Sequence, residues 1–157
     1  MTAEKIDLKQ KIRALAIYGS SRGNTKLIVN RLPAHFTFHV DIVEASSILD
    51  ADIIIKYDLL LFFASTWGDG ELQIDMENFL ISNHLNLNGK PYAICELGNY
   101  YGYDDFEFGA MRIMRNQLEQ WNGYELIEPF SMDTFPRKDW NSLTCWCELL
   151  NHNVEKL

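Results

Sequence analysis

The sequence has little positive charge and no long hydrophobic segment. Its 157 residues contain 14 lysines and arginines against 22 aspartates and glutamates, a formal net charge of −8. Nucleic acid and anionic membranes are therefore poor partners, and a basic protein surface is a better one. No apolar run approaches the roughly 20 residues that span a bilayer, and the first eleven residues lack the apolar core of a signal peptide. We expect a cytoplasmic protein with no membrane contact.

Cysteine and histidine are also scarce. Cys95, Cys145 and Cys147 are odd in number, and the C-x-C spacing of the last two matches neither a zinc motif nor a C-x-x-C redox motif. We therefore expect buried thiols in a reducing compartment. The four histidines lie outside every candidate loop described below, so they indicate neither a general base nor a metal site: His35, His39, His84 and His152.

Strand-like and helix-like segments alternate along the chain, with no repeat, low-complexity tract or linker. The hydrophobic patterns predict strands at 12–18, 36–43, 58–64, 91–97 and 124–130. They predict helices at 25–31, 75–85 (with Asp75 as the cap), 106–121 and 140–154, and a short helical or irregular crossing at 45–54. Such alternation is typical of an α/β fold with right-handed crossovers. We predict one domain over residues 1–157, a five-stranded parallel sheet of order 2-1-3-4-5 with helices on both faces, a three-layer sandwich.

A polar loop after the first predicted strand is a candidate phosphate site. Hydroxyl and amide side chains surround Gly23 just before a predicted helix: Ser20, Ser21, Asn24 and Thr25. Backbone N–H groups at a helix start favour an anion. The loop lacks the Lys-Ser/Thr pair of a Walker A motif and is not G-x-G-x-x-G, so triphosphate chemistry is not expected. A terminal monophosphate held mainly by neutral donors fits better, although the loop alone could equally be a polar turn that caps a helix.

Two aromatic loops follow later strands. Residues 65–71 come directly after the most apolar run, 59–64, and Trp67 there is a candidate wall for a flat aromatic cofactor. A core or rim tryptophan is the alternative, but the neighbouring glycines are a poor setting for core packing. The loop at 98–103 is rich in tyrosine and supplies a second wall or an interface patch. All three loops lie at the carboxyl ends of predicted strands, where open α/β sheets bind ligands.

These three motifs together resemble those of the short-chain flavodoxins, over nearly the whole chain. Residues 18–25 resemble the phosphate loop of that family, with Arg22 where a threonine is usual. Residues 65–71 are similar, almost letter for letter, to its first isoalloxazine loop, and residues 97–103 to its second, with Asn99 where an aspartate is usual. Only about 35 residues follow Asn122, which leaves no room for the insertion that marks long-chain members.

The resemblance implies a flavodoxin-like fold and a low-potential one-electron carrier that is not an enzyme. It implies non-covalent FMN with its ring between Trp67 and Tyr103, no metal and no catalytic residue. The residues implied in FMN binding are Ser20, Ser21, Arg22, Gly23, Asn24, Thr25, Ser65, Thr66, Trp67, Gly68, Asp69, Gly70, Leu97, Gly98, Asn99, Tyr100 and Tyr103. In the family the peptide after the tryptophan, here Gly68, flips on one-electron reduction to accept a hydrogen bond from flavin N5. Expected partners are basic redox proteins, a flavin reductase as donor and a metalloenzyme as acceptor, and a monomer is expected.

Charged residues in and beside these loops suggest how the cofactor is tuned. Acidic side chains cluster there: Asp69, Glu71, Asp75, Glu77, Asp104, Asp105 and Glu107. They would oppose a second negative charge on the flavin and attract a basic partner, or they are simply solvated loop charges. Arg22 predicts salt-sensitive FMN binding. Asn99 predicts a less negative second potential than an Asn99→Asp variant would have.

Two other functions compete with electron transfer. An FMN-dependent reductase, such as a quinone reductase or an activator of a metal-dependent reductase, is the main alternative, but such relatives usually have different loops around the ring. A signalling receiver domain shares the five-stranded fold. It requires a phosphoacceptor aspartate at the end of the third strand, where this chain has Ser65 and Thr66, so this interpretation is rejected.

Overall fold

The computed structural model describes residues 12–67, 70–98, 109–134 and 137–157. Within them the strands are β1 (Arg13–Tyr18), β2 (His39–Glu44), β3 (Leu59–Trp67), β4 (Glu71–Leu72), β5 (Pro91–Gly98), β6 (Tyr124–Glu125) and β7 (Phe130–Asp133). The α-helices are α2 (Asn24–Arg31), α3 (Ile74–Ser82), α4 (Gly109–Gln120) and α5 (Trp140–Val154). Short 3₁₀ helices complete the described chain: η1 (Leu32–His35), η2 (Ala45–Ser47) and η3 (Ala51–Lys56).

The strands form one sheet in the order β2-β1-β3-β5-β6. Both β6 and β7 pair in parallel with β5, so they form one interrupted edge strand. The remaining neighbours are also parallel except β4, which pairs antiparallel with the end of β3. With β6 and β7 counted as the fifth strand, the predicted order 2-1-3-4-5 is confirmed.

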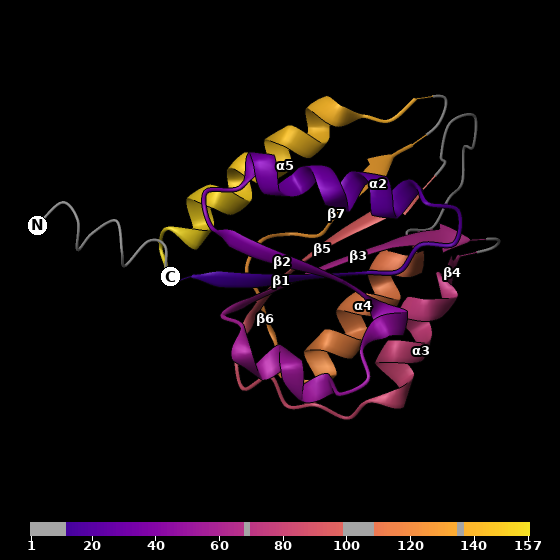
Figure 1. Ribbon diagram of the computed structural model, residues 1–157, viewed down its shortest axis with the longest axis vertical. Helices are drawn as coiled ribbons and strands as arrows, with labels where there is room; N and C mark the ends of the chain where they lie inside the picture. The colour runs from indigo at the N-terminus through magenta and orange to yellow at the C-terminus, as the bar shows by residue number, and fades with distance from the viewer. Residues whose placement is uncertain (1–11, 68–69, 99–108, 135–136) are drawn as a thin grey trace, which may run out of the picture.

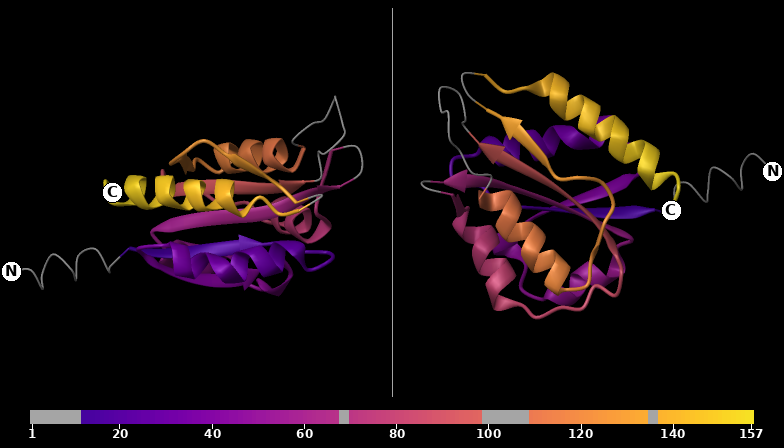
Figure 2. Two further views of the ribbon diagram at one scale, coloured as in Figure 1. Left: turned by 90° about the horizontal axis from the view of Figure 1, so that it is seen from above. Right: turned by 180° about the vertical axis from the view of Figure 1, so that it is seen from behind.

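Helices cover both faces of the sheet (Figure 1). Helices α2 and α5 lie on one side, and α3 and α4 on the other, as the view from behind also shows (Figure 2). Each face has its own hydrophobic core, one containing residues of α2 and α5 and one containing residues of α3 and α4. The three-layer sandwich predicted from the sequence is therefore confirmed.

Strand β3 is the centre of this arrangement. Residues 59–64 are fully buried, and they alternate between the two cores: Leu59, Leu61 and Phe63 belong to one, Leu60, Phe62 and Ala64 to the other. This is why the run has no polar alternation: each residue, whichever way it points, meets a layer of helices. The amide of Gly19 donates to the carbonyl of Phe63 at 3.0 Å. This bond joins the ends of β1 and β3 at the carboxyl edge of the sheet, called the site edge below because the candidate loops leave the strands there.

Strand β3 is longer than the predicted 58–64. It continues to Trp67, and residues predicted to be loop form a hairpin with β4. Thr66 pairs with Leu72, and Trp67 with Glu71. The extension occurs because β4 supplies hydrogen-bonding partners just where the neighbouring parallel strands end. Gly70 completes the turn with φ 101°, which an L side chain rarely adopts.

The second and fifth strands also differ from their predicted spans. The strand predicted at 36–43 begins only at His39, because Asn151 of α5 binds the backbone before it: its side chain accepts from the Thr37 amide at 3.0 Å and donates to the His35 carbonyl at 2.8 Å. The strand predicted at 124–130 is interrupted between β6 and β7. Pro129 lies in that interruption and has no N–H for a ladder bond.

Helix boundaries agree with the predictions within a few residues, but two details were wrong. The cap of α3 is Gln73, not Asp75: the Gln73 side chain accepts from the Met76 amide at 3.0 Å. Cys145 is exposed on α5, whereas Cys95 and Cys147 are buried as expected, and burial raises the pKa of both buried thiols. The predicted start of α4 at 106–108 lies outside the described residues. Among the described helices none combines the length and apolar character needed to cross a membrane.

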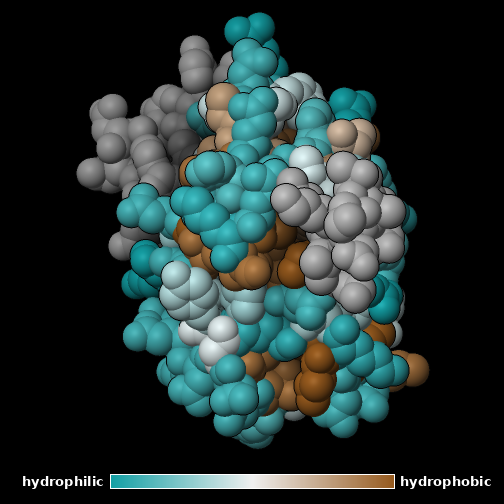
Figure 3. Space-filling view, turned by 90° about the vertical axis from the view of Figure 1, so that its left-hand side faces the viewer, coloured by the Kyte–Doolittle hydropathy of each residue, from teal (hydrophilic) through white to brown (hydrophobic). Residues whose placement is uncertain are grey.

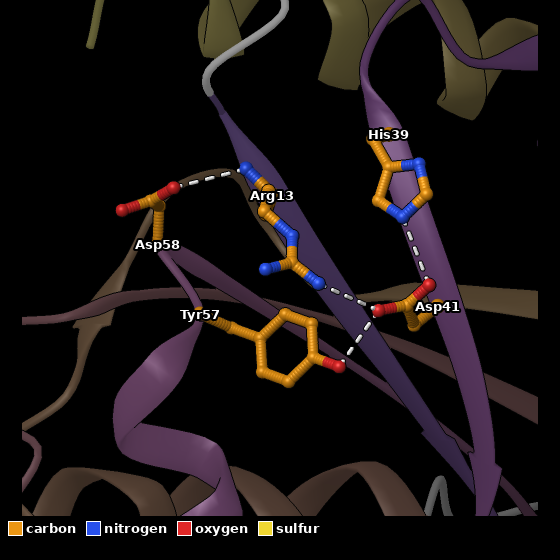
Figure 4. Close-up of polar contacts among 5 residues, drawn as sticks. All are labelled: Arg13, His39, Asp41, Tyr57 and Asp58. Atoms are coloured by element: carbon orange, nitrogen blue, oxygen red, sulfur yellow. Dashed lines mark hydrogen bonds and ion pairs between the residues drawn. The ribbon is translucent and has the colours of Figure 1, made fainter.

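The amino ends of the strands lie at the edge of the sheet away from the candidate site. The surface there is mainly hydrophilic, with hydrophobic residues between the polar ones (Figure 3). A polar cluster joins the starts of β1, β2 and β3 (Figure 4). Asp41 accepts from Tyr57 Oη at 2.7 Å, pairs with Arg13 Nη2 at 3.2 Å and contacts His39 Nε2 at 2.8 Å. Asp58 accepts from the Arg13 amide at 2.9 Å.

Candidate functional site

The first candidate loop joins β1 to α2. Its turn is closed by the Gly23 amide, which donates to Ser20 Oγ at 3.0 Å, and Gly23 has φ 88°. Helix α2 then begins with no side-chain cap and no acidic residue in its first turn. The first amides of a helix are unsatisfied by the helix itself and carry partial positive charge. Ser21, Arg22 and Asn24 are exposed beside them, whereas Thr25 is only 2% exposed.

Gln73, which the sequence analysis missed, connects this loop to the next. Its Nε2 donates to Ser21 Oγ at 3.1 Å, and its backbone amide donates to the Ser65 carbonyl at 3.0 Å. A Cβ on Gly19 would lie 1.9 Å from Gln73 Oε1, so only glycine fits there without displacing the amide. Gln73 lies two residues before the helix predicted at 75–85, and Asp75 was predicted as the cap in its place.

Trp67 lies at the end of β3, half-buried. Its indole Nε1 donates to Ser65 Oγ at 2.7 Å, which orients the ring. The guanidinium carbon of Arg22 lies 4.9 Å from the centroid of that ring, a cation–π contact. This contact brings the first and second candidate loops together across the ends of β1 and β3.

The third candidate loop is described only at its start. Leu97 is in the core and pairs with Ser65 of β3, so the second and third loops leave adjacent strands. The Gly98 carbonyl accepts from both the backbone amide and the hydroxyl of Thr134, each at 3.0 Å. The remaining predicted site residues lie outside the described residues: Gly68, Asp69, Asn99, Tyr100 and Tyr103.

A second residue that the sequence analysis missed is Glu96 on β5, which is 0% exposed. Its carboxyl oxygens accept hydrogen bonds from the hydroxyls of Thr66 and Ser131, both at 2.5 Å. Burial, and secondarily the charge of Glu96, raises the pKa of the neighbouring Cys95 thiol well above its ordinary value. The sequence signal that could have identified Glu96 is a single carboxylate within the otherwise mainly apolar residues 92–97.

The chemistry of this edge fits FMN. The helix start has uncapped amides and hydroxyls, with no carboxylate in its first turn to repel a phosphate dianion. An indole ring fixed by its own hydrogen bond lies beside it and offers a flat apolar surface. Within the described ranges, no group of three or more histidines, cysteines, aspartates or glutamates could hold a metal ion.

Comparison with known proteins gives a consistent result. The flavodoxin family matches residues 17–139. The flavodoxin of Synechococcus elongatus is 31% identical over 123 residues, 74% of this chain and 72% of that protein. The flavodoxin of Maridesulfovibrio salexigens is 26% identical over 135 residues, which are 81% of this chain and 90% of that protein.

Solved structures share the fold. The crystal structure of oxidised flavodoxin 2 from Bacillus cereus has a TM-score of 0.75 and 23% identity, over 92% of this chain and 98% of that chain. A short-chain flavodoxin associated with a non-canonical PDU bacterial microcompartment has a TM-score of 0.74 and 16% identity, over 92% of this chain and 97% of that chain. At these identities the structures support the fold alone, whereas the family match covers most of the chain. The chain therefore belongs to the flavodoxin family, whose members bind FMN and transfer electrons rather than act as enzymes.

Proposed function

We propose that this chain is a low-potential one-electron carrier that takes electrons from a flavin reductase and passes them to a metalloenzyme. The observation that carries the proposal is the contact of Arg22 with Trp67 at 4.9 Å. It joins Arg22, a cation just before the uncapped start of α2, to the Trp67 ring on β3, the strand beside β1. A flavin that carries a phosphate requires both an anion site and an aromatic surface. Bound FMN supplies the one-electron chemistry. The residues of the chain bind it, orient it and keep water from its ring.

The phosphate of FMN is assigned to the loop before α2. Ser20, Ser21, Asn24 and the amides around Gly23 would donate to its oxygens, and Arg22 would add a permanent positive charge. Thr25 is the exception, because its side chain is almost completely buried. We assign Thr25 a contact through its backbone amide in the first turn of α2.

The isoalloxazine ring is assigned to the second and third loops. Arg22 covers one face of the Trp67 indole, and the flavin would stack on the other face, with Tyr103 as the opposite wall. Ser65, Thr66 and Gly70 would line the ring from the β3–β4 hairpin, and Leu97 and Gly98 from the end of β5. The further contacts proposed from the family resemblance are Gly68, Asp69, Asn99 and Tyr100.

A low potential and a basic partner are proposed from the acidic residues beside Trp67. Glu71 is exposed, and Asp75 and Glu77 in the first turn of α3 are half-buried. Each carboxylate ~10 Å from a reduced flavin would oppose its negative charge by roughly 0.8 kcal/mol at an effective dielectric constant of ~40. The same charges would attract a positively charged reductase or metalloenzyme. We further propose that residues 1–157 act as one cytoplasmic, monomeric domain.

Stepwise reduction of the purified protein in the presence of FMN tests this function. We expect stoichiometric FMN uptake, followed by two separated one-electron steps, the second at a strongly negative potential. Failure to take up FMN would contradict the proposal. Steady NADPH oxidation by the protein alone would instead support an FMN-dependent reductase, and gel filtration of the same sample tests the monomer.

A further inference from the structure

Glu96 has no role in the function described so far, yet its position in the fold is unusual. It lies two residues before the end of β5, and its side chain is completely buried between apolar neighbours of the same strand. Burying a carboxylate is unfavourable unless hydrogen bonds replace its water. Two residues that supply such bonds come from other strands, Thr66 from β3 and Ser131 from β7.

The hydrogen bonds of Glu96 connect three adjacent strands. Thr66 Oγ1 donates to Oε1 from β3, and Ser131 Oγ donates to Oε2 from β7, both at 2.5 Å. In register, Glu96 pairs with Ala64 on β3 and with Ser131 on β7, so its carboxyl group lies between both neighbouring strands at the site edge. Hydroxyl donors at both carboxyl oxygens stabilise the ionised form of a carboxylate.

The hydroxyl of Thr66 takes part in a second hydrogen bond. The amide of Ala110, in the first turn of α4, donates to Thr66 Oγ1 at 3.1 Å. Because Oγ1 is the acceptor in that bond, the single proton of the Thr66 hydroxyl is available for donation to Glu96 Oε1. The chain of bonds therefore runs from the start of α4 through Thr66 to Glu96, and Thr66 is the residue directly before Trp67.

The start of α4 is held close to the same hairpin. A Cβ on Gly109, the first residue of α4, would lie 2.0 Å from the carbonyl oxygen of Gly70, so the two backbones are in direct contact. The carboxylate of Glu96 thus lies where the hairpin that carries Trp67, the end of β5 and the start of α4 meet.

We propose that Glu96 is a positioning residue of the flavin site that also sets its potential. Through Thr66 it ties the Trp67 end of β3 to β5 and to the start of α4, while Ser131 ties it to β7, and its buried negative charge makes the bound flavin harder to reduce. This inference rests on the proposed FMN-dependent electron transfer. It concerns a charge inside the protein, which solvent and salt screen much less than the charge of exposed Glu71.

Two substitutions separate the charge from the hydrogen bonds. Glu96→Gln keeps an acceptor for Thr66 and gains a donor to Ser131, but it removes the charge. Glu96→Ala removes both. We expect Glu96→Gln to bind oxidised FMN within about threefold of wild type, because the hydrogen-bonded geometry remains. We expect Glu96→Ala to bind it about tenfold more weakly and to unfold at a lower temperature as apoprotein, because Thr66 loses its partner.

The decisive measurement is a redox titration of FMN-loaded wild type and Glu96→Gln. The equilibrium for uptake of the second electron should favour the reduced flavin by roughly fivefold or more in the variant, the size expected for one charge at an effective dielectric constant of ~20 to 40. Glu125→Gln is the matched control. Glu125 pairs with Tyr92 near the start of β5 and with Arg115 at 2.7 Å, away from the site edge, so its loss should leave both potentials unchanged.

Equal second potentials in wild type and Glu96→Gln would overturn the proposal, and so would a Glu96→Gln protein that folds but no longer takes up FMN. If Glu96→Gln does not fold, Glu96→Asp serves instead. It keeps the charge and shortens the reach, so FMN affinity should fall while the second potential stays as in wild type; a shifted potential would contradict the role of the charge. Wild-type protein without FMN uptake would instead contradict the proposed function itself.

Discussion

Arg22 is a residue to which the structure adds a second contact. Its guanidinium was expected at the phosphate, but it lies 4.9 Å from the centroid of Trp67. Because the guanidinium is planar, it can stack on the indole and still direct N–H groups toward an anion. A threonine at this position would do neither. We infer that Arg22 contributes to FMN affinity both as a charge and as a support for the ring.

Replacement of Arg22 by threonine should weaken FMN binding by about tenfold at low salt, the size of one exposed charge-assisted hydrogen bond. The difference in affinity should shrink as salt rises, because salt screens the attraction between Arg22 and the phosphate in wild type and the variant lacks that attraction. Fluorescence titration of the apoprotein with FMN at several salt concentrations measures this.

Arg31→Thr provides a matched control for this prediction. Arg31 makes the same kind of contact, 4.6 Å from the centroid of Trp140. It lies at the carboxyl end of α2, away from the site, so FMN affinity should not change. If Arg22→Thr and Arg31→Thr have the same affinity at every salt concentration, Arg22 has no role in FMN binding. Arg22→Lys, which keeps the charge, should retain the salt dependence with a weaker stack on Trp67.

Among the secondary-structure elements, the starts of β1, β2 and β3 are held together by Asp41. The pKa of Asp41 lies below its ordinary value of 3.8, chiefly because the Tyr57 hydroxyl donates to it, with further contributions from His39 and Arg13. A lowered pKa means that folding favours the ionised form. Asp41 therefore contributes stability above its unfolded pKa, and this contribution is lost as the pH falls through the folded pKa.

Asp41→Asn should lower the free energy of unfolding at pH 7 by about 0.5–1.5 kcal/mol, the net value of a hydrogen bond at a partly exposed site. The difference from wild type should begin to shrink as the pH falls through the unfolded pKa of about 4, and it should be lost as the pH falls through the lower folded pKa. Urea unfolding at pH 7 and at pH 3 measures both values. Tyr57→Phe should reduce the effect of Asp41→Asn when the two are combined, and an undiminished difference at pH 3 would contradict this account.

At the scale of the whole molecule, the net charge of −8 affects the rate of association with a charged partner. Glu71 on β4 is exposed and Asp75 and Glu77 on α3 are half-buried, at the edge where the flavin is proposed. Electrostatic attraction raises association rates by roughly 10- to 1,000-fold at low salt and is screened at high salt. The protein should therefore receive electrons more slowly from a basic reductase as ionic strength rises.

The reduction rate with a basic flavin reductase should fall by about tenfold or more between low salt and 0.5 M salt. A variant that combines Glu71→Gln, Asp75→Asn and Glu77→Gln should lose most of this dependence in stopped-flow measurements. A variant that combines Glu148→Gln, on α5, with Glu155→Gln, directly after α5, should keep it. Equal salt dependence in both variants would show that the overall charge, not the charge at the site edge, directs association.

Much of the fold could be predicted from the sequence, because the signals for it are local. The apolar run 59–64 predicts a strand covered on both faces, and the spacing of apolar residues in 140–154 predicts α5 with the bounds observed. The three loop motifs are also contiguous in the sequence. They were predicted to share one edge because parallel strands end there together, and the contact of Arg22 with Trp67 is consistent with this.

Tertiary structure decided what depends on distant partners. Gln73 reaches Ser21, 52 residues earlier, and Glu96 takes its hydrogen bonds from residues 30 and 35 positions away. The extension of β3 to Trp67 depends on β4, and the late start of β2 depends on Asn151 of α5. The local sequence pattern does not predict these contacts, because the hydrogen-bond partner of a polar side chain depends on which distant residues the fold places beside it. The sequence by itself therefore determined the sheet, its helices and the three loop motifs of the candidate site, whereas tertiary packing selected the residues that connect those loops.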